Sequence, residues 1–284
     1  MRIRAITATN ILPVKNFQVD NLSDLVVIAG PNGVGKTRLI TGLLQYFQNF
    51  SGNNPSFIIE ATNSNEETLF GAKSINTANP QDAQKLQGLL QKNRRRRNLT
   101  SSIVYFESDR SIQKVQPLTF QFDFPDPWEE ELGWNLSFGG LANRWQDTQH
   151  AIFKKIQSQK SSIATRAIQL KRDGHGSMNL DFSDPLDPFR DAFSQLLGPK
   201  TLAAADIQRQ ILTYEYDGET RDVNTLSSGE REVLNIIFDF ILRKPSDCIV
   251  FFDEPELHLH PELLSKLIST LKYVGKDNQF ILIS

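Results

Sequence analysis

Alternating apolar and polar positions open the chain and predict paired strands. Residues 3–11 alternate, Pro13 interrupts the pattern, and residues 17–20 resume it. An apolar run at 25–29 then predicts a short buried strand, and residues 36–50 have the pattern of a helix. Two strands ahead of the buried one suggest an antiparallel sheet laid against a second sheet.

The next part of the chain carries weaker patterns. Residues 51–79 are rich in Asn, Ser, Gly and Thr, which predicts a loop with at most short ordered pieces. Residues 81–90 fit a helix, and residues 103–106 and 118–124 fit strands. A long, basic, turn-poor stretch at about 141–172 has apolar residues at roughly helical spacing, and we interpret it as a helical insertion.

Strands and helices alternate again towards the end of the chain. Helices are expected from just after Pro188 to Leu197, at 229–243 and at 261–273, and strands at 211–216, 248–252 and 280–283. Alternation with short connections is typical of a mainly parallel α/β sheet. We therefore expect an α/β core formed by residues 1–50 and 205–284, with residues 51–204 inserted between its two parts.

Bulk composition adds few constraints. A formal net charge of -2 over 284 residues gives no global electrostatic reason to bind nucleic acid. The single cysteine, Cys248, excludes an internal disulfide framework and lies in an apolar run where a buried thiol is expected. The N-terminus has no signal peptide, and no apolar stretch approaches the roughly 20 residues that cross a bilayer. These features predict a cytoplasmic protein that does not enter a membrane.

The segment 30–37 supplies the first chemical motif. It reads Gly-Pro-Asn-Gly-Val-Gly-Lys-Thr, a complete phosphate-loop pattern between the buried strand and the helix. Its glycines allow backbone N–H groups to point at phosphate oxygens, and the helix directs its positive end at the same charge. An ordinary glycine-rich turn is the alternative, but the order of strand, loop and helix favours ATP binding. The predicted ATP-binding residues are Asn32, Gly33, Val34, Gly35, Lys36 and Thr37.

Two acids follow the buried strand at 248–252. Carboxylates at the carboxyl end of a buried parallel strand lie where ligands bind in open sheets. We expect Asp253 and the Thr37 hydroxyl to hold Mg²⁺, Lys36 to contact the β- and γ-phosphates, and Glu254 to activate the attacking water. An acid pair in a surface turn is the alternative, which the upstream phosphate loop disfavours.

The segment 226–230 reads Leu-Ser-Ser-Gly-Glu and begins a predicted helix. Ser, Gly and Glu here are suited to cap that helix. The segment also resembles the signature motif of ATP-binding-cassette (ABC) ATPases, with Ser228 in place of the first glycine. The resemblance implies that Ser227, Ser228, Gly229 and Glu230 contact ATP held by a second subunit, so that the protein works as a homodimer or higher homo-oligomer.

Residues 254–261 continue the resemblance in an unusual form. His260 stands where ABC transporters carry the aspartate of their D-loop, and the sequence is similar to the soluble branch that includes the overcoming-lysogenization-defect (OLD) nucleases. SMC and RecF-type ATPases also insert helical material, although sustained heptads are absent here. A metal site formed by Glu256, His258 and His260 is an alternative for this stretch.

Two features of the family, the switch histidine and the Q-loop glutamine, are not assigned to a single residue of this sequence. The sequence ends at Ser284, where a switch histidine would come next, so we expect a longer protein whose remainder holds that residue and any Toprim-like nuclease domain. Candidates for the Q-loop glutamine are Gln113, Gln116 and Gln121.

Two further groups of residues have alternative interpretations. The four arginines at 94–97 form either a site for a phosphate backbone or an acidic partner, or a solvated turn. The tryptophans are expected to pack the insertion onto the core rather than to stack on bases; they are Trp128, Trp134 and Trp145.

Three functions follow from the resemblance. The first is an ATP-dependent switch that controls a nuclease-type effector, fused or separate, in bacterial antiphage defence. The second is a DNA-repair or chromosome-binding ATPase that clamps duplex DNA with its basic insertion. The third is a scaffold that binds ATP without turnover.

Overall fold

A computed structural model of the chain describes residues 1–50, 52, 54–90, 101–108, 110, 145–174, 184–206 and 211–284. These residues divide into two units. The first unit contains the described residues of 1–110 and 243–284, and the second contains those of 145–242.

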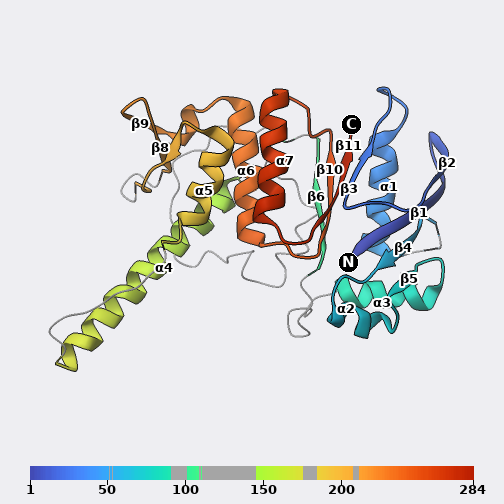
Figure 1. Ribbon diagram of the computed structural model, residues 1–284, viewed down its shortest axis with the longest axis horizontal. Helices are drawn as coiled ribbons and strands as arrows, with labels where there is room; N and C mark the ends of the chain where they lie inside the picture. The colour runs from blue at the N-terminus through green and yellow to red at the C-terminus, as the bar shows by residue number, and fades with distance from the viewer. Residues whose placement is uncertain are drawn as a thin grey trace. The chain divides into compact units, whose positions relative to one another are not determined.

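A parallel sheet organises the first unit. Its strand order is β3-β11-β10-β6, and each neighbouring pair is parallel (Figure 1). The strands are β3 (Leu25–Ile28), β11 (Gln279–Ile283), β10 (Ile249–Asp253) and β6 (Ile103–Phe106). Every residue of β10 is buried, as expected for a central strand covered on both faces. The predicted α/β class and parallel sheet are confirmed.

An antiparallel sheet forms the other wall of the first unit. Its order is β2-β1-β4-β5, so the predicted N-terminal antiparallel β subdomain is also confirmed. The strands are β1 (Arg2–Ile11), β2 (Val14–Val19), β4 (Ser56–Glu60) and β5 (Ser74–Asn76). Helices α2 (Ser64–Phe70) and α3 (Pro80–Leu90) complete this part.

Strands β4, β5 and β6 come from the range that the sequence assigns to an insertion. Residues 51–79 were expected to be a loop with at most short ordered pieces, and they contain the short elements β4, α2 and β5. Their order is greater than expected, because Phe57 and Ile59 of β4 face the core while the strand pairs with β1. Strand β6 pairs with β10 inside the parallel sheet. Local composition concealed β4 and β5, since their stability comes from strand partners elsewhere in the sheet. Strand β6 corresponds to the strand expected at 103–106.

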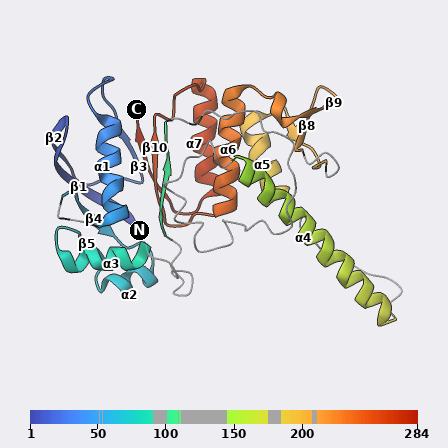
Figure 2. The same cartoon turned by 180° about the vertical axis from the view of Figure 1, so that it is seen from behind.

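Helix α1 (Lys36–Asn49) lies between the two sheets of the first unit (Figure 2). Its apolar residues join those of β1, β4, β10 and β11 in one buried cluster. The Phe47 and Phe57 rings are 4.6 Å apart, and Tyr46 also contacts Phe57. The helix that follows the phosphate loop is therefore fixed on two sides.

Gln279 joins the two sheets through polar contacts. Its buried side-chain oxygen accepts a hydrogen bond from the Ile3 N–H at 2.7 Å. Its amide nitrogen donates to the Ile3 and Ser23 carbonyls at 2.8 and 2.9 Å. The amide thus acts as a substitute peptide group between β11 and β1.

The second unit contains α4 (Trp145–Arg172), α5 (Asp187–Leu197), α6 (Ser228–Arg243) and a small antiparallel sheet of order β7-β8-β9. The strands are β7 (Thr201–Leu202), β8 (Thr213–Tyr216) and β9 (Glu219–Asp222). The sequence placed the strand at 211–216 in the parallel core. It instead forms a hairpin through Asp217 and Gly218, both at positive φ, a turn signal that the sequence carried.

Helix α4 corresponds to the expected helical insertion. Trp145 is buried and stacks on Phe238 of α6 at 6.2 Å, which fits its expected packing role. No described α4 residue beyond Ile156 is buried.

Cys248 is buried, as expected. None of the described helices combines the length and the apolar character of a membrane span.

We expect Gln279→Met to lower the free energy of unfolding by about 2 to 4 kcal/mol, because it leaves the buried Ile3 N–H and C=O without partners. Urea denaturation measures this loss. Gln18→Met, at an exposed position of β2, is the matched control and should change stability by less than about 0.5 kcal/mol. Equal stabilities for the two variants would contradict the bridging role.

Candidate nucleotide-binding site

The segment 30–37 connects β3 to α1 as the motif predicts. The Gly30 N–H donates to the Ser284 carbonyl at 3.2 Å, which ties the start of the loop to the end of β11. Gly33 and Gly35 have φ angles of 83° and 99°. A Cβ on Gly35 would lie 2.5 Å from the Pro13 ring, so the β1–β2 turn packs directly on this glycine. Close approach and positive φ both require glycine here.

The first turn of α1 has an unusual charge. It contains Lys36 and Arg38 and no acid, although the free N–H groups of a helix start favour negative charge. The Lys36 ammonium donates to the Gly30 and Pro31 carbonyls at 2.6 and 3.2 Å. Two cations beside a positive helix end form a site suited to an anion.

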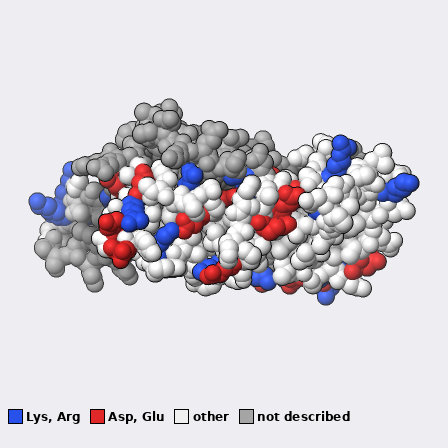
Figure 3. All heavy atoms as spheres, turned by 90° about the horizontal axis from the view of Figure 1, so that it is seen from above, with Lys and Arg blue, Asp and Glu red and all other residues white. Residues whose placement is uncertain are grey.

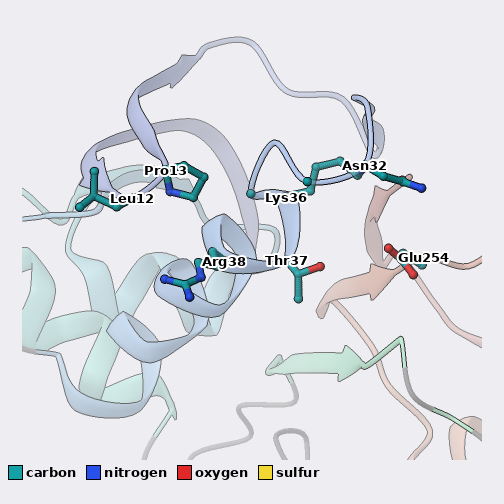
Figure 4. Close-up of a pocket in the computed structure, with 9 residues that line it drawn as sticks. Leu12, Pro13, Asn32, Lys36, Thr37, Arg38 and Glu254 are labelled. Carbon is teal, nitrogen blue, oxygen red and sulfur yellow. The ribbon is translucent and has the colours of Figure 1, made fainter.

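A pocket of about 680 Å³ opens over this turn (Figure 4). Its volume lies within the range of small-molecule sites. The Leu12–Pro13 turn supplies an apolar wall, and Glu254 approaches from β10. The lining residues are Leu12, Pro13, Asn32, Gly33, Gly35, Lys36, Thr37, Arg38 and Glu254. Thus all the predicted loop residues except Val34 line one pocket, together with Glu254.

Asp253 is the last residue of β10 and is fully buried. Among the described residues, neither carboxylate oxygen accepts a hydrogen bond of normal geometry. Burial and then the negative charge of Glu254 raise the pKa of Asp253, although the nearby Thr37 hydroxyl and Arg110 oppose this shift. An isolated buried carboxylate is costly unless a cation compensates it. Carboxylate and hydroxyl oxygens are ligands that Mg²⁺ prefers, so Asp253 and Thr37 fit that ion.

Glu254 turns sharply away from the strand. It has φ 44°, and its N–H donates to the Ile283 carbonyl at 2.7 Å. This left-handed conformation is uncommon outside glycine, and it separates the directions of the two neighbouring acids. Glu254 therefore lines the pocket while Asp253 remains buried.

Arg110 is a component of the site that the sequence did not reveal. Its buried guanidinium donates to the carbonyls of Asp253 and Glu254 at 2.7 and 2.9 Å and to that of Glu107. It also lies 5.0 Å from the centre of the Phe252 ring. Arg110 therefore fixes the backbone of both acids. No spacing pattern marks this residue, because its contacts to the two acids span more than 140 positions of the chain.

The signature-like residues lie in the second unit. The Ser227 hydroxyl donates to Glu230 Oε2 at 2.9 Å and accepts from the Glu230 N–H at 3.3 Å. The Ser227 N–H also donates to Glu230 Oε2, at 3.0 Å. This reciprocal capping box begins α6. Ser228 and Gly229 form the first residues of that helix.

The structure does not form the alternative metal site at residues 256–260. Among the described residues, no group of three or more His, Cys, Asp or Glu side chains is placed to hold a metal. His260 instead caps α7 (Pro261–Val274), where its Nδ1 accepts from the Glu262 N–H at 3.4 Å. Glu256 accepts from the Ser284 hydroxyl.

Several predicted features lie outside the described residues. They are the arginines at 94–97, the Q-loop candidates Gln113, Gln116 and Gln121, and Trp128 and Trp134.

On the face that Figure 3 shows, acidic and basic side chains are interspersed among uncharged ones.

Comparison with known families gives one match over most of the chain. The family described as "AAA domain, putative AbiEii toxin, Type IV TA system" matches residues 25–284. This range contains the phosphate loop, the acid pair and the signature-like segment. No curated protein matches the sequence of this chain.

Solved structures with a similar fold include an SMC head bound to the C-terminal winged-helix domain of ScpA, with TM-score 0.52 and 13% identity over 100% of this chain and 90% of that one. An SMC head domain from Thermotoga maritima gives TM-score 0.47 and 14% identity over 100% and 89% of the two chains. A putative ABC transporter ATP-binding protein from Pyrococcus furiosus has a TM-score of 0.41 and 13% sequence identity, over 99% of this chain and 89% of that one. The first match establishes that this chain shares the fold of an SMC head.

We expect Asp253→Asn to stabilise the magnesium-free protein by about 1 to 3 kcal/mol at neutral pH, because it removes a buried charge whose oxygens accept no hydrogen bond of normal geometry among the described residues. The same variant should lose the additional thermal stabilisation that Mg²⁺ gives in the presence of ATP. Thermal unfolding with ATP, with and without Mg²⁺, measures both effects. Asp277→Asn, an exposed acid in the same unit, is the control. An unchanged response to Mg²⁺ would exclude Asp253 from the metal site.

Proposed function

Because this chain belongs to the AAA domain family described as putative AbiEii toxin of type IV toxin–antitoxin systems, we propose that it is an ATP-driven switch in which two copies close around ATP and separate after hydrolysis. The observation that carries the proposal is the buried Asp253 carboxylate, which meets no donor of normal geometry among the described residues and lies near Thr37. A cation site beside a phosphate loop is the arrangement that nucleoside triphosphate chemistry requires.

Within one copy, the loop N–H groups and Lys36 bind the phosphates. Lys36 exchanges its bonds to the Gly30 and Pro31 carbonyls for phosphate oxygens. Thr37 and Asp253 would hold Mg²⁺, which would neutralise phosphate charge when bound. The Leu12–Pro13 turn borders the pocket and covers part of the nucleotide.

Glu254 acts as the general base. Its carboxylate lines the pocket and accepts a proton from the attacking water. The water oxygen bonds to the γ-phosphorus, and the bond from that phosphorus to the β,γ-bridging oxygen breaks, which gives ADP and phosphate. Arg110 maintains the direction of Glu254 through its backbone carbonyl.

The second copy completes the site through Ser227 and Gly229. The start of α6 presents N–H groups and a hydroxyl, which together form a group of donors for a γ-phosphate. ATP therefore links two copies, and its hydrolysis removes that link. Such a dimer converts nucleotide state into a change of assembly.

The assembly controls an effector in a bacterial defence or toxin–antitoxin system. The words "putative AbiEii toxin" in the family description and the OLD-like sequence of residues 254–261 support this assignment. The effector is a nuclease-type protein, fused or separate. A scaffold that binds ATP without turnover is the competing hypothesis.

We expect Glu254→Gln to lower the rate of ATP hydrolysis by about 10² to 10⁴-fold, because amide nitrogen and oxygen cannot accept the water proton as a carboxylate does. The variant should retain ATP affinity and accumulate as an ATP-dependent dimer in analytical ultracentrifugation. Phosphate release assays measure the rate.

Glu256→Gln is the matched control, since it changes the neighbouring exposed acid. It should hydrolyse ATP within about threefold of the parent protein. A scaffold would give the same dimer population for Glu254→Gln as for the unaltered chain, which would contradict the switch.

A second candidate function has support from α4. Between residues 154 and 172 this helix has six basic and no acidic side chains, and no described residue after Ile156 is buried. The basic residues are Lys154, Lys155, Lys160, Arg166, Lys171 and Arg172. A basic helix of this kind fits the phosphate backbone of duplex DNA.

If α4 binds duplex DNA, replacing Lys160, Arg166, Lys171 and Arg172 by Gln should weaken binding and flatten its salt dependence. The slope of log K against log salt should fall by about 0.9 for each cation that contacts phosphate. Fluorescence anisotropy over a series of salt concentrations measures this change. Lys73→Gln, at an exposed position of the first unit, is the control. If the fourfold variant and the unaltered protein have the same slope, α4 is excluded as a DNA contact.

A further inference from the structure

In the proposed dimer, residues 226–230 face the nucleotide that the other copy binds, and Glu230 gives this segment a negative charge. Glu230 Oε2 accepts hydrogen bonds from both the N–H and the hydroxyl of Ser227. In the proposed dimer, that hydroxyl meets the γ-phosphate of ATP held by the other copy. A carboxylate so close to a polyphosphate would repel it unless a cation compensates the charge.

Lys200 is placed to provide that compensation. It lies between α5 and β7, and its ammonium donates to Glu230 Oε1. The two side chains are only 20% and 22% exposed, so solvent screens the pair incompletely. Each oxygen of the Glu230 carboxylate therefore has its own donor, one from Lys200 and the other from Ser227.

The small antiparallel sheet holds Lys200 in this position. Its ammonium lies 5.8 Å from the centre of the Tyr214 ring and 5.7 Å from that of Tyr216, both on β8. Tyr214 is itself buried, and its hydroxyl contacts the Thr225 hydroxyl just before the signature-like segment. Aromatic faces attract cations, so Lys200 is oriented before any ligand arrives.

Burial is the largest effect on Glu230 and raises its pKa. Hydrogen bonds from Lys200 and from Ser227 outweigh it, and the pKa is lowered overall. Glu230 therefore remains ionised at neutral pH, and its charge has to be neutralised within the protein.

The Ser227 hydroxyl has a single proton. When it donates to a phosphate oxygen it can no longer donate to Glu230, and the carboxylate retains only the Ser227 N–H and Lys200. Lys200 thus becomes more important at the moment of engagement.

We propose that Lys200 is a positioning residue of the composite ATP site: it holds and neutralises the Glu230 carboxylate so that the Ser227 hydroxyl can bind the nucleotide of a second copy. This inference rests on the proposed function, because it requires a nucleotide shared between two copies. It assigns to the α5–β7 connection and the β8 ring pair a role in dimerisation.

A double-mutant cycle tests the proposal in full-length protein with ATP and Mg²⁺, in the Glu254→Gln background so that hydrolysis does not intervene. Lys200→Met should raise the ATP-dependent dimer dissociation constant about tenfold, because it leaves an uncompensated charge at the interface. Glu230→Gln keeps the capping box but removes the charge that Lys200 compensates. Adding Lys200→Met to Glu230→Gln should therefore change the constant by less than about threefold relative to Glu230→Gln alone, which is the signature of charge compensation.

Lys200→Arg should retain most of the affinity, since it preserves the charge. Arg221→Met is the matched control, because Arg221 also pairs with an acid and contacts the Tyr216 ring but does not touch α6. Thermal unfolding without nucleotide establishes that each variant is folded. A tenfold weakening that persists in the double variant would overturn the proposal, because the lysine would then act independently of the Glu230 charge.

Ser227→Ala separates failure of this inference from failure of the dimer model. If Ser227→Ala weakens the dimer while Lys200→Met does not, Lys200 has no positioning role and the shared site stands. If neither variant affects the dimer although each copy still binds ATP, the shared site itself is excluded, and the role of Lys200 is excluded with it.

Discussion

The parallel register of the β3-β11-β10-β6 sheet is the constraint on which the candidate site depends. Ile28 pairs with Ile283, and Asp253 pairs with Ile283 from the other side, so three strands end at the same level. Ligand sites in open parallel sheets form at this edge because the chain leaves every strand there. The phosphate loop, the acid pair and the Arg110 guanidinium are all held at that edge. A shift of one residue in β10 would move Asp253 to the opposite face.

Charged groups in this edge are arranged for a ligand rather than for the protein alone. The first helical turn of α1 contains two cations, and the end of β10 contains a buried carboxylate without a normal donor. Both arrangements are unfavourable by themselves. The surrounding structure has to maintain them, and it does so through Arg110, the Gln279 bridge and the aromatic packing of α1. These charged groups lower the stability of the fold locally and favour the binding of a ligand at the same place.

The carboxylate of Glu230 in the second unit is neutralised in a different way from that of Asp253. Glu230 is ionised and close to the proposed phosphate contact, but the protein supplies its own cation in Lys200. For Asp253, in contrast, the proposed function assigns the neutralisation to an external cation. In that proposal the distinction has a functional reason, since Mg²⁺ enters with the nucleotide whereas the start of α6 has to approach the nucleotide of another copy without repelling it.

The sequence by itself determined the elements and groups whose signals are local. The phosphate loop, the acids after β10, the capping box at Ser227 and the helical character of α4 are each encoded in a few adjacent residues. Periodicity also identified the α/β class and most of the helices, because apolar spacing within a segment fixes which face is buried. The tertiary structure alone decided the partners of these segments. Strand β4 gains order from β1 and strand β5 from β4, and the roles of Arg110, Gln279 and Lys200 depend on hydrogen bonds to residues far along the chain. Such contacts leave no spacing in one sequence, since folding rather than the chain order brings their atoms together.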